Sequence, residues 1–213
     1  MHHIAVIDYG MGNLRSVSKA LEAVSSNASV VVTSDPKTIL SASHVLFPGV
    51  GAIRDCMAEL KQLELEDVIL QATQEKPFLG ICLGMQALLS HSEENNGVDT
   101  LNLFSGSVKL FRPDASVNGE KLKVPHMGWN QVHQTCSHPL WKNIEQNSRF
   151  YFVHSFYAEP IDKAVIAGTS AYPDDFAAAL YKDNIFAAQF HPEKSQRAGL
   201  QLLENFVNWD GQS

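Results

Sequence analysis

Short apolar runs and amphipathic stretches alternate at the start of the chain. The run from Ile4 to Asp8 is almost continuously apolar, as in a strand that is covered on both faces of a sheet. Residues 14–24 follow with apolar side chains at helical spacing, including Val17 and Leu21. Asn13 stands directly before this stretch, and asparagine is a favoured helix-capping residue. The beginning of the chain therefore predicts a buried strand and a helix packed on it.

The same alternation continues as far as residue 86. We expect strands at 30–33, 45–47 and 78–81, helices at 52–60 and 65–74, and a turn at 34–36. Strands that alternate with helices build a mostly parallel sheet with helices on both faces. In such sheets ligands bind at the carboxyl ends of the strands, so residues that follow a predicted strand are the first candidates for chemistry.

The second half of the chain has a different pattern. After a polar stretch at 92–100, short strand-like runs dominate, at 106–111, 150–154, 165–171, 176–181 and 185–189. Lys182-Asp183-Asn184 separates the last two runs and predicts a hairpin, so we expect an antiparallel extension of the sheet. A final amphipathic helix is expected at 198–209. With no repeat, linker or low-complexity segment, the sequence predicts a single α/β domain over residues 1–213.

Composition narrows the class of protein. The chain has 213 residues, of which 45% are hydrophobic and 18% charged, which suits a compact domain with a sizeable core. A net charge of −7 argues against a nucleic-acid surface. No apolar run reaches the roughly 18 residues needed to cross a bilayer, and the start has no signal-peptide layout, so we expect a cytoplasmic protein. The three cysteines lack metal or disulfide spacing and are expected to be free thiols.

Cys82 stands between two glycines where a predicted strand meets a helical stretch. The pattern G-I-C-L-G at 80–84 is typical of a nucleophile elbow, in which a sharp turn holds the nucleophile in a strained backbone conformation. The glycines allow the strand and the helix to approach each other. A helix N-terminus also favours thiolate over thiol. The alternative is a buried structural cysteine, which is how most free cysteines behave.

His191 and Glu193 follow the last predicted strand and could activate this thiol. A cysteine nucleophile needs an imidazole within hydrogen-bond reach, and a carboxylate on the other ring nitrogen fixes the tautomer and orientation. Pro192 cannot donate to a sheet ladder, so the strand must end near His191. The alternative is a polar surface turn, because the chain contains 9 histidines and a histidine alone means little. Together with the elbow, the pattern favours a Cys-His-Glu triad.

A glycine-containing loop at 48–51 follows the third predicted strand. Related hydrolase folds place part of the oxyanion hole there. The developing negative oxygen needs rigid N–H donors, and glycines let the backbone turn its donors inward. We expect one donor to be the amide of Leu83 and the other to be the amide of Val50 or Gly51. An ordinary Pro-Gly turn is the alternative for this loop.

Two of these motifs, GICLGMQ at 80–86 and QFHPEKS at 189–195, resemble the class I glutamine amidotransferases. Four more motifs are similar to the glutaminase subunits of imidazole glycerol phosphate synthases, enzymes of histidine biosynthesis: DYGMGNL at 8–14, PGVGA at 48–52, PHMGWN at 125–130 and YFVHS at 151–155. The resemblance spans nearly the whole chain. Anthranilate and carbamoyl phosphate synthases are less similar, because they carry Gly-Pro-Gly where this chain has Phe-Pro-Gly at 47–49.

The resemblance implies a reaction and a role for each matching residue. It makes Cys82 the nucleophile that glutamine acylates, His191 the base and then the acid, and Glu193 the residue that orients His191. Free glutamine is a zwitterion, so charge and amide pairing must fix it before its side-chain carbonyl meets the sulfur. The positions that match the glutamine pocket of the family are Gly49, Gln86, Glu94, His154, Ser155 and Phe156. Glu94 lies in a polar stretch, and a solvated face is the alternative for it.

The resemblance also implies a partner. The family passes ammonia to a (β/α)8-barrel synthase subunit through an internal passage, as a heterodimer, and the ammonia reacts there with a ribosyl-phosphate aminoimidazole intermediate. Asn13, Trp129 and Lys194 match positions that face this partner, although core packing is the alternative for Trp129. We expect the Val50 region to form a working oxyanion hole only in the complex. The sequence shows no motif for a cofactor or a metal ion.

Three alternatives remain open at this point. The chain could be a stand-alone cysteine hydrolase of the same fold, which would act on model amides without a partner. It could be the glutaminase subunit of another amidotransferase. It could also be a binding or redox-sensing protein that keeps a reactive Cys82, although the intact pair of His191 and Glu193 argues against this reading.

Overall fold

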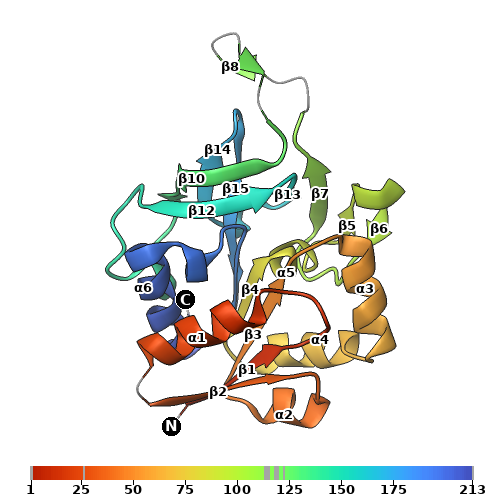
Figure 1. The fold of residues 1–213 in the computed structure, drawn as a ribbon, viewed down its shortest axis with the longest axis vertical. Coiled ribbons are helices and arrows are strands. Elements are labelled where there is room, and N and C mark those ends of the chain that lie inside the picture. The colour runs from red at the N-terminus through yellow and green to blue at the C-terminus, as the bar shows by residue number, and fades with distance from the viewer. Residues whose placement is uncertain (1, 26, 113–115, 118–119, 122, 213) are drawn as a thin grey trace.

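A central sheet divides the molecule into two layers of helices, as Figure 1 shows. The computed structural model describes residues 2–25, 27–112, 116–117, 120–121 and 123–212. Five neighbouring strands are parallel and form the core of the sheet. Their spatial order is β2 (Ala28–Thr33), β1 (His2–Ile7), β3 (His44–Gly49), β4 (Phe78–Cys82) and β16 (Ile185–Ala188). The predicted parallel α/β sheet is confirmed.

Beyond β16 the sheet continues with strands that pair antiparallel, apart from one parallel pair. The order there is β15 (Asp175–Lys182), β13 (Phe156–Pro160), β7 (Gly106–Leu110), β5 (His91–Ser92) and β6 (Val98–Asp99), and the parallel pair is that of β5 and β7. The predicted hairpin joins β15 and β16, which pair antiparallel. Strand β14 (Ile166–Ala171) pairs with β15 and with β11 (His133–Gln134). Two separate ribbons complete the strands: β10 (His126–Gln131) with β12 (Arg149–His154), and β8 (Ser116–Val117) with β9 (Glu120–Lys121).

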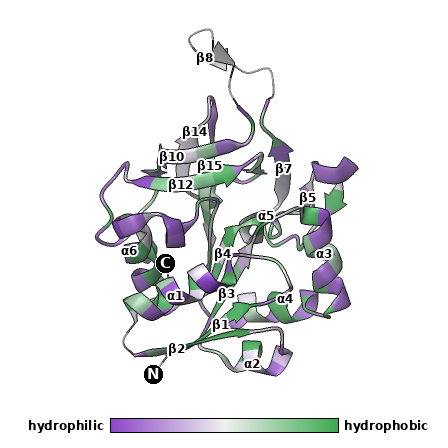
Figure 2. Ribbon diagram, viewed as in Figure 1, coloured by the Kyte–Doolittle hydropathy of each residue, from purple (hydrophilic) through white to green (hydrophobic). Residues whose placement is uncertain are grey.

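Helices cover both faces of the sheet. Figure 1 shows α1 (Leu14–Val24) and α6 (Gln196–Val207) on one face, and α3 (Ile53–Gln62) and α4 (Glu66–Glu75) on the other. Two apolar clusters result, one on each face, and Figure 2 shows the hydrophobic strands between them. Short 3-10 helices lie at Glu94–Asn96, Pro139–Trp141, Lys163–Val165 and Pro192–Lys194. Among the described residues, no helix has both the length and the apolar character to span a bilayer.

Two local predictions about helix starts need correction. Asn13 occupies the N-cap position of α1, but its side chain makes no capping hydrogen bond. The predicted turn at 34–36 is the start of a short helix, α2 (Pro36–Ser41). The Asp35 carboxylate accepts a hydrogen bond from the Thr38 N–H at 2.9 Å, and Pro36 takes the first helical position. Asp followed by Pro is thus a helix-start signal here, and reading it as a turn was wrong.

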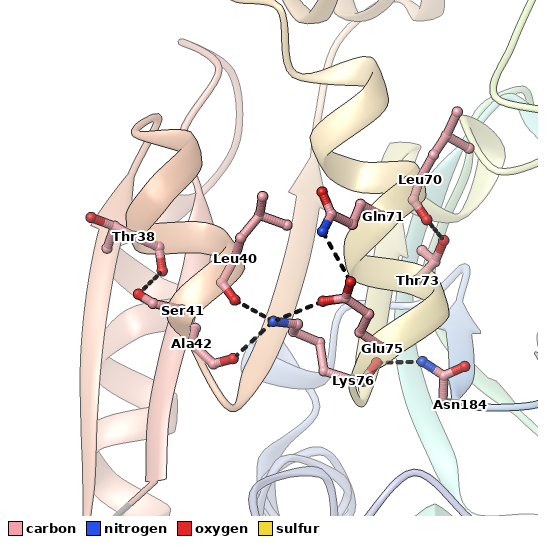
Figure 3. A network of polar contacts seen from close by, with 10 residues as sticks. All are labelled: Thr38, Leu40, Ser41, Ala42, Leu70, Gln71, Thr73, Glu75, Lys76 and Asn184. Atoms are coloured by element: carbon pink, nitrogen blue, oxygen red, sulfur yellow. Dashed lines mark hydrogen bonds and ion pairs between the residues drawn. The ribbon is translucent and has the colours of Figure 1, made fainter.

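A buried lysine ties α2 to α4. The Lys76 ammonium donates to the carbonyl oxygens of Leu40 and Ala42, which end α2, and lies 3.8 Å from a Glu75 carboxylate oxygen (Figure 3). Asn184 in the β15–β16 turn donates to the Lys76 carbonyl. A cation at the C-terminus of a helix pairs carbonyls that have no partner inside the helix. Lys76 therefore joins three elements at the edge opposite the strand ends that carry the site.

Candidate active site

Cys82 ends β4 in the strained conformation of an elbow. Its φ is +55° and its ψ is −111°, outside the usual regions for a residue with a side chain. Helix α5 (Leu83–Gln86) begins at the next residue. A Cβ at Gly84 would lie 2.0 Å from the Phe47 carbonyl oxygen, so only glycine allows the helix to approach β3 this closely. The elbow predicted from the two glycines is therefore present.

The loop after β16 brings His191 to the same edge of the sheet. Strand β16 is the parallel neighbour of β4, so the two strands end side by side. His191 Nδ1 lies 2.9 Å from a carboxylate oxygen of Glu193, and the two side chains are 2% and 0% exposed. Because a carboxylate only accepts, Nδ1 carries a proton, and Nε2 is the other nitrogen of a ring that lines the same cavity as Cys82.

The charge state of His191 depends on its neighbours. Burial by itself lowers the pKa of His191, but Cys82 and Glu193 oppose burial and raise the pKa to about 10. The contact of the ring with the Cys82 sulfur contributes most to the raised pKa of His191, and the Glu193 carboxylate contributes next. This arrangement stabilises a protonated imidazole beside the sulfur of Cys82.

A cavity of about 340 Å³ opens over the elbow. This volume lies in the range of small-molecule sites. Most residues expected at the site line it: Val50, Gly51, Cys82, Leu83, Gln86, Glu94, His154, Ser155, Phe156 and His191, together with Pro125 and Val153. Gly49 does not line it. A Cβ there would lie 2.6 Å from the Tyr9 hydroxyl and 2.8 Å from the Leu83 Cβ, so Gly49 permits close packing of β3 against the elbow.

The pocket residues differ in how much of their hydrogen bonding is already used. One carboxylate oxygen of Glu94 accepts the Ile53 N–H at 3.0 Å and so caps α3. His154 Nδ1 lies 2.7 Å from the Phe156 carbonyl oxygen, and its Nε2 lies 3.0 Å from Nδ1 of His126. Burial lowers the pKa of His154 to about 3, which keeps it neutral. His154 is therefore a fixed wall of the cavity and has no free charge.

Gln189 is a site residue that the sequence did not single out. Its Nε2 lies 3.6 Å from Sγ of Cys82, and its Oε1 accepts a hydrogen bond of 2.9 Å from Gln86. The only signal in the sequence is its place two residues before His191. Gln189 directly follows a strand that is buried at every position. The apolar pattern alone therefore could not distinguish Gln189 from an ordinary core residue.

The three candidate partner residues lie near this edge of the sheet. Trp129 on β10 is 40% exposed and meets the Tyr151 ring edge to face, with 6.2 Å between ring centroids. The Lys194 ammonium lies 5.9 Å from the centroid of the same ring. Asn13 is partly exposed directly before α1. Core packing does not describe Trp129, and Tyr151 joins it to Lys194 in one exposed cluster.

Comparison with known proteins identifies the family. The family model for glutamine amidotransferase class-I matches residues 5–209. The chain is 59% identical to imidazole glycerol phosphate synthase subunit HisH from Nitrosococcus oceani, over all of both chains. It is 57% identical to the HisH subunit from Pseudomonas syringae pv. syringae, over 99% of each.

Solved structures agree on the fold at low sequence identity. PurLQS from Thermotoga maritima superposes with a TM-score of 0.74 at 18% identity, covering 98% of this chain and 99% of that chain. A glutamine amidotransferase from Thermotoga maritima gives a TM-score of 0.60 at 19% identity, covering 92% of this chain and 78% of that chain. The sequence matches are thus far closer than the structural ones, and they place this chain in the class I glutamine amidotransferase family, among the HisH subunits of imidazole glycerol phosphate synthase.

Proposed function

We propose that this chain hydrolyses L-glutamine to glutamate and ammonia through Cys82, His191 and Glu193, and that it supplies the ammonia to a (β/α)8-barrel subunit that forms imidazole glycerol phosphate. One observation carries the proposal. A cysteine on a strained elbow shares a cavity with a histidine whose other ring nitrogen is 2.9 Å from a fully buried carboxylate. This geometry supports the roles of nucleophile for Cys82, base for His191 and orienting acid for Glu193.

The substrate would enter the cavity with its polar end toward Gln86 and Glu94. Gln86 uses its Nε2 in two bonds within the protein, to the Phe156 carbonyl oxygen and to Gln189. Its Oε1 is left to accept from the α-ammonium group of glutamine. Glu94 keeps one carboxylate oxygen for the same ammonium group. These contacts would hold the side-chain amide over Sγ, which is what positions a bimolecular reaction for attack.

The reaction then follows in two steps. Sγ attacks the side-chain carbonyl carbon, and the oxygen takes the electron pair of the double bond and faces the N–H of Leu83 and that of Val50 or Gly51. The oxyanion collapses to a γ-glutamyl thioester, the C–N bond breaks, and His191 gives its proton to the departing ammonia. His191 next takes a proton from water, whose oxygen attacks the thioester. Glutamate leaves and the thiolate returns.

The partner would bind over the exposed cluster formed by Trp129, Tyr151 and Lys194. Exposed aromatic and cationic side chains are enriched in protein interfaces. Asn13 would add a contact from the start of α1. Val50, 38% exposed at the rim of the cavity, can respond to such a partner, and we propose that binding sets its loop for oxyanion stabilisation. The cytoplasmic location expected from the sequence stays a prediction.

The deciding experiment compares two nitrogen sources. In the complex with the barrel subunit, Cys82→Ala should abolish synthesis from glutamine and leave synthesis from added ammonium salts unchanged. Cys136→Ala, which removes a partly buried thiol outside the cavity, is the matched control and should keep both activities. Loss of both activities in Cys82→Ala would contradict the assigned role.

A second measurement tests the partner. Glutaminase turnover should rise strongly when the barrel partner and its ligand are added. Equal turnover with and without them would reject activation by the partner. Hydrolysis of simple model amides by the isolated chain would favour the stand-alone hydrolase instead.

A further inference from the structure

Gln189 lies between the glutamine pocket and the nucleophile. It is fully buried, one residue beyond the end of β16. Its backbone N–H donates to the Ala178 carbonyl at 2.9 Å, which anchors its main chain to β15. Its side-chain amide reaches Gln86 at one end and Sγ of Cys82 at the other. These contacts hold the side-chain amide of Gln189 between Gln86 and the sulfur of Cys82.

The neighbouring bonds fix which end of each amide faces which group. The Phe156 carbonyl oxygen can only accept, so the Gln86 nitrogen, 3.0 Å away, must face it. The same nitrogen lies 2.9 Å from Gln189, so Gln189 must present its oxygen there. The Gln189 nitrogen is therefore the atom that faces the sulfur, at 3.6 Å. His154 Nδ1 also lies 2.7 Å from the Phe156 carbonyl oxygen. This second contact holds in place the acceptor that orients Gln86.

A donor aimed at the sulfur has a chemical consequence. An N–H bond to a thiolate is charge-assisted and is stronger than the bond to a neutral thiol, so it favours the charged nucleophile. The donor at Gln189 also restrains the position of Sγ relative to Nε2 of His191. Because Gln86 lines the cavity, a ligand that bonds its Oε1 would polarise the same chain of amides toward the sulfur.

We infer that Gln189 is a positioning residue for glutamine hydrolysis, since its side-chain amide links the substrate-binding Gln86 to the nucleophile and holds Cys82 as a reactive thiolate. This inference rests on the proposed function. It assigns Gln189 no contact with the substrate, because Gln189 does not line the cavity. The competing view is that Gln189 is a buried amide that only supports the packing of β16.

The test uses two variants of Gln189 in the complex with the barrel subunit. Gln189→Met keeps the length of the side chain and removes the donor, and we expect kcat for glutamine hydrolysis to fall roughly 10- to 100-fold, with KM changed much less. Gln189→Glu keeps an acceptor for Gln86 but replaces the donor with a carboxyl group. A protonated carboxyl can still donate to the sulfur, whereas a carboxylate repels it, so the activity of this variant relative to wild type should fall as pH rises.

Two further measurements separate reactivity from folding. The rate at which iodoacetamide alkylates Cys82, followed by mass spectrometry across pH, should drop in Gln189→Met at neutral pH and recover at higher pH. Gln134→Met is the matched control, because Gln134 donates to the backbone carbonyls of Ile144 and Glu145 outside the cavity. This control should keep the wild-type rate and pH profile. Synthesis from ammonium salts reports whether each variant folds and binds its partner.

The outcomes distinguish this inference from the proposed function. A wild-type complex without glutaminase activity would overturn the proposed function itself. An active wild type whose kcat and alkylation profile are unchanged in Gln189→Met would overturn the inference about Gln189 alone. If Gln189→Met does not fold, the pH profile of Gln189→Glu decides: a wild-type profile overturns the inference, and a loss that grows with pH supports it.

Discussion

Two buried polar networks in this molecule differ in how completely their hydrogen bonds are satisfied. Around Lys76, the ammonium lies among two carbonyls and a carboxylate, and Thr73 and Asn184 each donate to a carbonyl (Figure 3). Around the elbow, three buried polar atoms have no hydrogen-bond partner among the described residues. They are Nε2 of His191, the second carboxylate oxygen of Glu193 and the Tyr9 hydroxyl.

This difference separates a structural network from a reactive one. A buried polar group without a partner destabilises the fold by about 1 to 3 kcal/mol, so such groups persist mainly where they have another use. In the proposed reaction, Nε2 of His191 must stay free to exchange a proton with the substrate. His138 and Ser170 also hold unpartnered atoms outside the cavity, so the criterion indicates a site only together with geometry.

The largest expected effect comes from removing the charge behind His191. Glu193→Gln keeps the size of the side chain but no longer stabilises an imidazolium, so glutamine hydrolysis in the complex should fall by roughly 10²- to 10⁴-fold. The free energy of unfolding at neutral pH should also fall, since the carboxylate helps to raise the pKa of His191 and so stabilises the folded state. Glu22→Gln, an exposed change on α1, serves as the control. If Glu193→Gln were destabilised but kept normal activity, Glu193 would have a structural role and no role in the reaction.

Acid should act next most strongly, through the neutral pair of His126 and His154. Burial lowers their pKa values to about 4 and about 3, from the ordinary 6.5. The unfolded chain therefore binds protons first as pH falls below about 6.5, and the fold loses stability from there toward pH 3, by a few kcal/mol in order of magnitude.

Denaturant unfolding at a series of pH values measures this loss. His126→Gln leaves a donor near His154 but cannot titrate, so its stability should vary less with pH than that of wild type. His3→Gln, at an exposed position, should keep the wild-type slope. His191 behaves oppositely: with its pKa raised to about 10, its contribution is full below pH 6.5 and disappears as pH rises through 10.

The smallest of these effects should come from the satisfied network. Lys76→Met leaves the carbonyls of Leu40 and Ala42 without their donor, and we expect the free energy of unfolding to fall by about 1 to 2 kcal/mol. Glutaminase activity of the folded complex should not change. Thermal unfolding and initial rates check both statements, with the exposed Lys61→Met on α3 as the control. If Lys76→Met lost activity without losing stability, the network around Lys76 could no longer be called purely structural.

Much of the fold followed from apolar periodicity. Helix α1 matches the expected residues 14–24, and the four expected strands of the first half are present. Strands β10 and β13 were missed because each is irregular in composition: β10 carries Gly128 and Asn130, and β13 carries a proline. The stretch at 92–100 is polar, yet it contains the end of β5, a 3-10 turn and β6. Strand β5 pairs with β7 on one side and with β6 on the other, through backbone contacts that no side-chain pattern reports.

The site was predictable only where its chemistry is written as a local motif. The elbow and the sequence HPE are each a few residues long, so Cys82, His191 and Glu193 could be named from the sequence. Gln189 and Tyr151 could not, because the contact of Gln189 with Cys82 and that of Tyr151 with Lys194 join segments more than forty residues apart. The capping contact of Glu94 to Ile53 is likewise a tertiary contact, invisible to spacing.

The seam between β3 and the elbow is closely packed around two glycines. Gly49 lies opposite Cys82 in register, and both Gly49 and Gly84 are pressed against main chain or against a rigid tyrosine. A displacement of the loop at 50–51 would thus move the main chain at Gly49 and, through the pairing of β3 with β4, the main chain at Cys82. An event at the rim of the cavity can therefore reach the nucleophile along the main-chain pairing of β3 with β4.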